Sequence, residues 1–195
     1  MSKLTSKISG RISMNSPVVL GFTAICLIAL VLSAITGGQT NNLLFSVYNS
    51  SLLSPFTYIR FVGHVFGHAG WEHFMGNIML ILVIGPLLEE KYGSLDIAAV
   101  ILSTAVVTGL INFIFFPSVQ LLGASGVVFA FILLSSFTGF RDGKIPFTFI
   151  LVAVLYIGKE VVNGIFIQDN VANLTHIIGG LVGSAFGFEI NKIRR

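Results

Sequence analysis

The chain alternates between long apolar runs and short polar stretches. Six apolar runs stand out, at Pro17–Ile35, Phe74–Leu88, Ile97–Phe116, Ala124–Phe140, Pro146–Phe166 and Val171–Ile190. Most of them approach the ~20 residues that a helix needs to cross the hydrocarbon core of a bilayer. The pattern predicts an all-α, polytopic membrane protein whose six transmembrane helices form one domain, residues 17–191.

Composition supports this prediction. Hydrophobic residues make up 54% of the chain and charged residues only 10%, whereas an ordinary soluble domain has roughly 25% charged residues. The net charge of +3 does not indicate nucleic-acid binding, because the basic residues stand at the ends of apolar runs and form no single patch. The only cysteine, Cys26, lies inside an apolar run, so an intramolecular disulfide is excluded.

The basic residues also predict the orientation in the membrane. With six spans, one side of the bilayer receives Lys3, Lys7, Arg11, Lys91, Arg141, Lys144, Lys192, Arg194 and Arg195. The opposite side has Arg60, with Lys159 nearby. Because Lys and Arg near span ends are retained in the cytoplasm, both termini are expected there. The loops Thr36–His73, Pro117–Gly123 and Ile167–Asn170 are then expected to face outward.

Residues 1–16 and 192–195 are expected to be a cytoplasmic amphipathic basic arm and a cytoplasmic basic tail. In the arm, Lys3, Lys7 and Arg11 recur every fourth residue beside a similar apolar stripe, which is typical of a helix lying on a membrane surface. A secretory signal peptide is the alternative, but the run that follows is long for one and no clean cleavage site follows it. The long loop Thr36–His73 is expected to be partly helical and to lie in the membrane interface.

Polar residues inside apolar runs need a reason, because they are costly in lipid. His73 and Asn77 are four residues apart and therefore share a helix face. Ser125 and His176 stand near the outer ends of two further helices, so all four are predicted at one depth. The helix of His176 also carries a stripe of small residues, Gly179 and Gly183, and Gly126 and Ala130 form a similar patch beside Ser125. Small residues let two helix backbones approach closely, so the two helices are expected to pack against each other.

A serine beside a histidine favours nucleophilic catalysis, since the imidazole takes the proton of the hydroxyl. Gly123 and Gly126 leave space and backbone N–H groups around Ser125, at a helix N-terminus where negative charge is favoured. His73 and Asn77 offer further donors. No Asp or Glu stands in an obvious third position, so the pattern favours a dyad over a triad.

Three motifs resemble the rhomboid intramembrane serine proteases: HVFGHAGWEHFMGN at His64–Asn77, GASG at Gly123–Gly126 and THIIGGLVG at Thr175–Gly183. The resemblance implies Ser125 as the nucleophile and His176 as the general base. It also implies an oxyanion hole formed by His73, Asn77 and the Ser125 N–H.

The resemblance further implies that Arg60 braces the first outer loop and that Glu89, with Gly93, is a structural feature of the turn after the second helix. The chain resembles the six-helix bacterial type of rhomboid. This resemblance implies a plasma membrane location, an active site that opens outward, and single-pass or polytopic membrane proteins as substrates. Entry is expected near the second and fifth helices, under the loop Ile167–Asn170, and neither metal nor cofactor is expected. Many members have Trp where this chain has Ile59, which leaves the packing of the loop open.

Other interpretations remain at this stage. Ser125 alone is compatible with simple helix packing. The spacing of His64, His68 and His73 is compatible with a metal site, although no acidic or cysteine ligand completes it. His64 and His68 are expected to be structural residues of the loop. A contact of His68 with the catalytic region is an alternative. Lys159 and Glu160 invite a transporter interpretation, and an inactive rhomboid-like scaffold that binds membrane proteins is a further alternative.

Overall fold

The computed structural model describes residues 14–137, 144, 147–148, 150–152, 154–155, 158 and 170–193. Its helices are α2 (Pro17–Ile35), the π-helix η1 (Asn41–Phe45), α3 (Pro55–Gly63), α4 (Trp71–Tyr92), α5 (Ser94–Phe115), α6 (Ser125–Ser136) and α8 (Asn170–Ile193). No strand occurs in these ranges, where an isolated bridge pairs Val47 with Leu121. The all-helical prediction is therefore confirmed for this part of the chain.

Three of the helices, α2, α4 and α5, are long and apolar enough to span a membrane, and Ser125–Ser136 and Leu174–Ile190 are shorter apolar helices. Most of the predicted fifth span and the end of the fourth lie outside the described residues. The same holds for most of the arm 1–16, for the residues 194–195 of the tail, and for Lys159 and Glu160.

Helix α4 extends beyond the predicted run Phe74–Leu88 at both ends. The added turns carry polar residues such as Glu72 and Lys91, which an apolar pattern does not include. Gly93, with φ of 90°, ends the helix, and α5 begins at the next residue. Glycine is required there because a side chain disfavours this left-handed conformation.

Glu89 lies within the last turn of α4, which corrects its predicted place in the turn after that helix. Its side chain is 4% exposed and accepts hydrogen bonds from the backbone N–H groups of Val18 at 3.0 Å and Val19 at 2.9 Å. The Ser94 hydroxyl donates to the same carboxylate at 2.7 Å. The first N–H groups of a helix have no intrahelical partner, so Glu89 supplies the N-terminal cap of α2 and joins α2, α4 and α5 at one end of the molecule.

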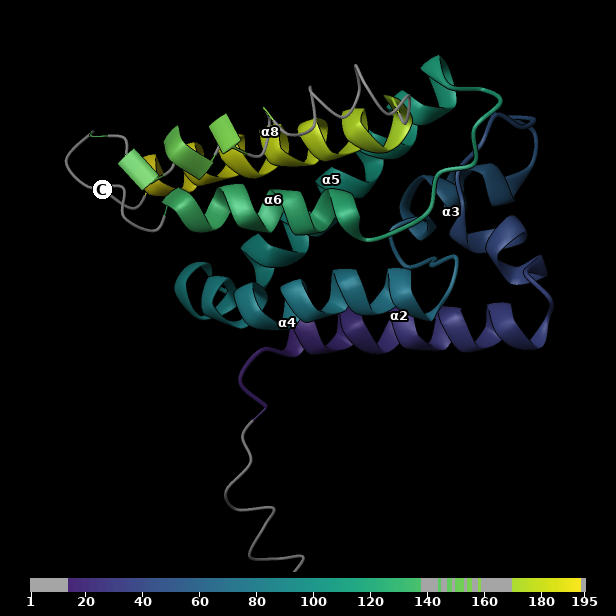
Figure 1. The fold of residues 1–195 in the computed structure, drawn as a ribbon, viewed down its shortest axis with the longest axis horizontal. Helices are drawn as coiled ribbons and strands as arrows, with labels where there is room; N and C mark the ends of the chain where they lie inside the picture. The colour runs from purple at the N-terminus through teal and green to yellow at the C-terminus, as the bar shows by residue number, and fades with distance from the viewer. Residues whose placement is uncertain are drawn as a thin grey trace, which may run out of the picture.

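Helix α6 is the centre of the bundle. It lies between α4 and α8, and α2 packs on the far side of α4 (Figure 1). A Cβ atom added at Gly179 would meet the backbone of Gly126, and one at Gly183 would meet the backbone of Ala130. The predicted contact between the two stripes of small residues is therefore observed, and it brings the backbones of α6 and α8 together.

The segment between α2 and α4 contains η1 and α3, so the prediction of a partly helical loop is confirmed. Arg60 is 4% exposed. Its guanidinium donates to the Ser50 hydroxyl at 2.7 Å and to the Leu43 carbonyl at 3.4 Å, and lies 4.5 Å from the centre of the Tyr48 ring. Ile59, which replaces the tryptophan of many rhomboids, is 48% exposed on the outside of α3.

Candidate active site

Ser125 is the first residue of α6 and is half-buried. The backbone that leads into it is held from two sides: Leu121 pairs with Val47 in the isolated bridge, and the Gly123 N–H donates to the His64 carbonyl at 2.9 Å. Gly123 has a φ of 132°, in the region that favours glycine. These contacts fix the entry of the chain into the helix, and with it the position of the Ser125 N–H.

His73 and Asn77 lie on the face of α4 that approaches Gly123. A Cβ atom added at Gly123 would stand 2.7 Å from His73 Nε2 and 3.9 Å from Asn77 Nδ2. Only a glycine leaves room for both side chains beside the backbone before Ser125. Asn77 is 7% exposed, and its Nδ2 has no hydrogen-bond partner among the described residues. A buried donor without a partner is costly, so this amide is free to donate to a bound group.

The tautomer of His73 follows from its other nitrogen. The Ala69 N–H donates to His73 Nδ1 in a long hydrogen bond of 3.5 Å. In a neutral imidazole one nitrogen accepts and the other carries the proton, so the proton of His73 is assigned to Nε2. That nitrogen is the one that faces Gly123. The geometry thus offers an N–H donor from His73 and an N–H donor from Asn77 to the same space.

His176 is half-buried on α8. Its ring stacks on Phe129 of α6, with 4.3 Å between the ring centres and an angle of 5° between the planes. Phe129 is one helical turn after Ser125 and shares its face. The preceding residue of α8, Thr175, would be 3.5 Å from a Cβ atom at Gly126. These contacts bring His176 to the Ser125 face of α6.

Phe129 is a residue of the site that the sequence analysis did not single out. Its signal in the sequence is weak, because one phenylalanine at a spacing of four from Ser125 does not stand out among the 18 phenylalanines of the chain. A stacked ring limits the rotation of an imidazole. Phe129 is therefore a candidate positioning residue for His176.

His64 and His68 are both 1% exposed. The ring of His64 contacts the Arg60 carbonyl and the Thr108 hydroxyl, and burial lowers its pKa to about 4. Burial, followed by the electrostatic effect of the neighbouring His73, likewise lowers the pKa of His68 to about 4. Both rings are neutral at pH 7 and occupy structural positions.

His68 Nδ1 hydrogen bonds the Phe66 carbonyl at 3.1 Å. Its ring meets His73 edge-on, with 5.1 Å between the ring centres, so His68 contacts the candidate site by packing. Within the described part of the chain, no group of three His, Cys, Asp or Glu side chains is placed to hold a metal ion.

The other predicted residues fall in different places. Gly126, Gly179 and Gly183 lie in the contact between α6 and α8. Arg60 lies on α3, in the segment before α4. Glu89 is about 24 Å from His73 along the axis of α4, at 1.5 Å per residue, so it does not belong to the site.

A family model for the Rhomboid domain matches residues 55–192. This chain belongs to the Rhomboid family. It is 29% identical to Rhomboid-related protein 2 of Mus musculus over 160 residues, which cover 71% of this chain and 53% of the relative. It is 25% identical to Rhomboid protease GluP of Bacillus subtilis over 173 residues, 85% of this chain and 33% of the relative. It is 24% identical to Rhomboid protease GlpG of Haemophilus influenzae over 143 residues, 70% of this chain and 71% of the relative.

Membership of the family confirms the resemblance and the membrane assignment. Rhomboids are embedded in membranes, and in the part of the chain that the structure describes α2, α4 and α5 have the length and composition to span one. Two of the relatives are named as proteases, whereas the name of the mouse relative states kinship only. The chain spans about half of the mouse relative and a third of the Bacillus relative.

Proposed function

We propose that this rhomboid is a serine endopeptidase that cleaves membrane-embedded segments of other proteins with a dyad of Ser125 and His176. One observation carries the proposal. Ser125 begins α6 between two sets of groups, with His176 stacked on Phe129 along its own face and the unpartnered Asn77 amide with His73 beside Gly123. A nucleophile, a base and oxyanion donors are the parts that acyl transfer requires.

In the proposed reaction, His176 takes the proton of the Ser125 hydroxyl as its oxygen attacks the scissile carbonyl carbon. The carbonyl oxygen becomes an oxyanion, which accepts hydrogen bonds from His73 Nε2–H, Asn77 Nδ2–H and the Ser125 N–H. The tetrahedral intermediate collapses as His176 returns the proton to the leaving amine, and an acyl-enzyme remains. Water, activated by His176, then attacks the ester and releases the second product. In these steps the protein contributes the side chains of Ser125, His176, His73 and Asn77 and one backbone N–H.

The substrates that fit this site are proteins that reach it through the membrane. A peptide bond within a helix is shielded by hydrogen bonds, so the substrate must unwind before attack. By resemblance, entry is near the second and fifth helices. The loop 167–170 that would cover this entry lies outside the described residues, except for its last position.

We further propose six spans in a bacterial plasma membrane, with both termini cytoplasmic and the site opening to the outer face. The support is the charge distribution and the position of Ser125, His73 and Asn77 at the end of the bundle opposite to Glu89. Ser2→Cys and Asp142→Cys should resist a membrane-impermeant thiol reagent in intact cells, and Asp169→Cys should react. Labelling at position 2 would reverse the orientation.

A direct test combines two measurements on detergent-purified protein. A fluorophosphonate should label the wild type and not Ser125→Ala, and a generic transmembrane substrate in proteoliposomes should be cut by the wild type alone. A wild type that binds the substrate without labelling or cleavage would favour the inactive scaffold. Solute flux across the vesicles without cleavage would favour the transporter.

A further inference from the structure

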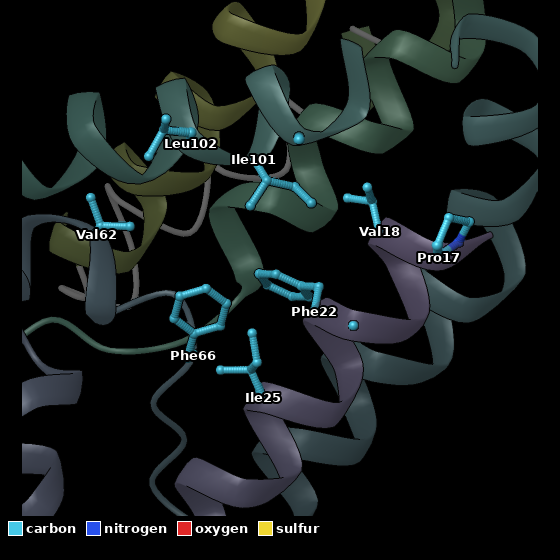
Figure 2. A pocket seen from close by; sticks show the side chains of 10 residues that line it. Pro17, Val18, Phe22, Ile25, Val62, Phe66, Ile101 and Leu102 are labelled. Atoms are coloured by element: carbon cyan, nitrogen blue, oxygen red, sulfur yellow. The ribbon is translucent and has the colours of Figure 1, made fainter. Parts of the chain in front are cut away.

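An apolar groove lies between α2 and α5, and Val62 of α3 forms part of its lining. The groove takes no part in the proposed protease reaction. Its volume is about 290 Å³. The lining side chains are all apolar, and Phe22, Phe66 and Ile101 turn toward the same space (Figure 2). The groove therefore offers contact area but no side-chain hydrogen bond.

The groove has open space because small residues, Gly21 of α2 and Ala98 of α5, leave it unfilled. Gly21 lines it, and a Cβ atom added there would meet nothing within 4 Å. Phe22 and Phe66, with 5.1 Å between their ring centres, lie at its wall. At the rim, Ile25 is 44% and Leu102 is 52% exposed, so the groove opens sideways. In a membrane protein this side faces lipid.

The groove runs along one leaflet of the bilayer. Helices α2 and α5 both begin at the end of the molecule where Glu89 joins them. From Pro17 to Ile25 the groove follows α2 for about 12 Å at 1.5 Å per residue. One leaflet of the hydrocarbon core is about 15 Å thick. The long axis of the groove thus matches the direction and length of a lipid tail.

Other occupants fit poorly. An unwound peptide would leave its backbone polar groups unsatisfied in this apolar lining. A second copy of the chain would need about 800 Å² of contact on each partner, more than a groove of this size provides.

The sequence that precedes the groove carries positive charge. The groove begins at Pro17, and Lys3, Lys7 and Arg11 precede that residue in the chain. Basic segments next to a membrane span attract anionic lipid headgroups. We propose that the groove holds one acyl chain of an anionic phospholipid from the leaflet at the N-terminal end of α2. This site does not depend on protease activity.

The test uses the full chain in nanodiscs that contain phosphatidylglycerol with a diazirine in its acyl chain. After illumination, mass spectrometry should find adducts concentrated on Ile25 and Leu102. Gly21→Phe should lower them by about tenfold, because a ring fills the space where the chain would lie. Ala24→Phe, which adds the same ring to an exposed position of α2 outside the groove, should leave them unchanged.

Adducts spread evenly over α2 and α5, or equal labelling of Gly21→Phe, would overturn the proposal. A cross-linked dimer would instead assign the groove to a second copy. The preference for an anionic headgroup is tested with a phosphatidylcholine probe that has the same acyl chains. This probe should label the groove less than the phosphatidylglycerol probe does. In the variant Lys3→Gln, Lys7→Gln, Arg11→Gln the two probes should label it equally. Equal labelling of the wild type by both probes would refute the anionic preference. If Gly21→Phe fails to fold, competition on the wild type decides, since unlabelled phosphatidylglycerol should displace the probe.

Discussion

A polar side chain is buried near each end of α4, and the two side chains differ in their hydrogen-bond partners. At one end, both oxygens of Glu89 are engaged, by Val18, Val19 and Ser94. At the other end, the Asn77 amide has no partner for its Nδ2 among the described residues. Burial without a partner costs free energy, and a bound group that accepts a hydrogen bond from this amide would remove that cost. The Glu89 end holds the helices together, and the Asn77 end is where a reacting group is expected.

Arg60 follows the pattern of Glu89. Its guanidinium contacts a carbonyl, two hydroxyls and an aromatic ring within the loop before α4. Glu89 and the two terminal nitrogens of Arg60 thus have protein partners at a distance from Ser125. The Asn77 amide beside the serine has none for its Nδ2, and Arg60 Nε is among the other buried atoms of the described residues without a partner. Predictions that separate stability from activity will test this contrast.

The largest effect is expected at the dyad. Ser125→Ala and His176→Ala should each lower kcat/KM by about 10⁴-fold or more, and the double variant should be no worse than either, because the pair acts as a unit. Melting temperatures should stay within a few degrees of the wild type. Ser135→Ala, on the same helix with its hydroxyl bonded to the Ile132 carbonyl, should remain active. Cleavage by purified Ser125→Ala would remove the nucleophile assignment.

At the opposite end of α4, Glu89→Ala should act on stability. It removes the acceptor of two N–H groups and a hydroxyl, each charge-assisted, so the free energy of unfolding should fall by about 3 kcal/mol. The kcat/KM per folded molecule should change by less than about threefold. Chemical denaturation in detergent measures the first quantity and steady-state kinetics the second.

Glu90→Ala is the matched control, because Glu90 is the exposed neighbour of Glu89. It should behave like the wild type in both measurements. A Glu89→Ala protein of normal stability and low activity would break the contrast between the two ends.

Asn77→Ala should give the reverse result. The loss of one oxyanion donor should lower kcat/KM by roughly tenfold to a hundredfold, softened by the donors that remain. His73→Ala in the same chain should deepen the loss. Stability should change little, because the amide has no partner for its Nδ2 to lose. A thermal melt beside kinetics on the same preparation decides: a lower melting temperature with unchanged kcat/KM would make Asn77 a packing residue.

The smallest effect concerns pH. Burial lowers the pKa of His64 from 6.5 to about 4, so the unfolded chain binds a proton at this residue between those values and the folded chain does not. This contribution to stability is complete above pH 6.5 and is lost as the pH falls toward 4. Unfolding free energy should drop by about 1–2 kcal/mol between pH 7 and pH 5. His64→Gln should be less stable at pH 7 and should show a shallower decline, and an unchanged slope would contradict the assignment.

Much of the fold was predictable because the helical spacing of residues and the length of apolar runs can be read directly from the linear sequence. The apolar runs predicted α2, α4 and α5, and the spacing of Gly126, Ala130, Gly179 and Gly183 predicted the close contact of α6 with α8. The position of Ser125 at a helix start followed from the end of one apolar run and the start of the next. These features depend on residues that are near one another in the chain or on a repeated spacing.

The partners of individual polar atoms were decided only by the tertiary structure. Glu89 caps a helix that begins about 70 residues earlier in the chain, and no local pattern connects the two. The proton on His73 Nε2 follows from the Ala69 N–H, and the ring of His176 is held by Phe129. A hydrogen bond or a stacked ring needs its two groups within a few ångströms, and the sequence by itself determines which groups are present, whereas the packing of the helices determines which of them meet.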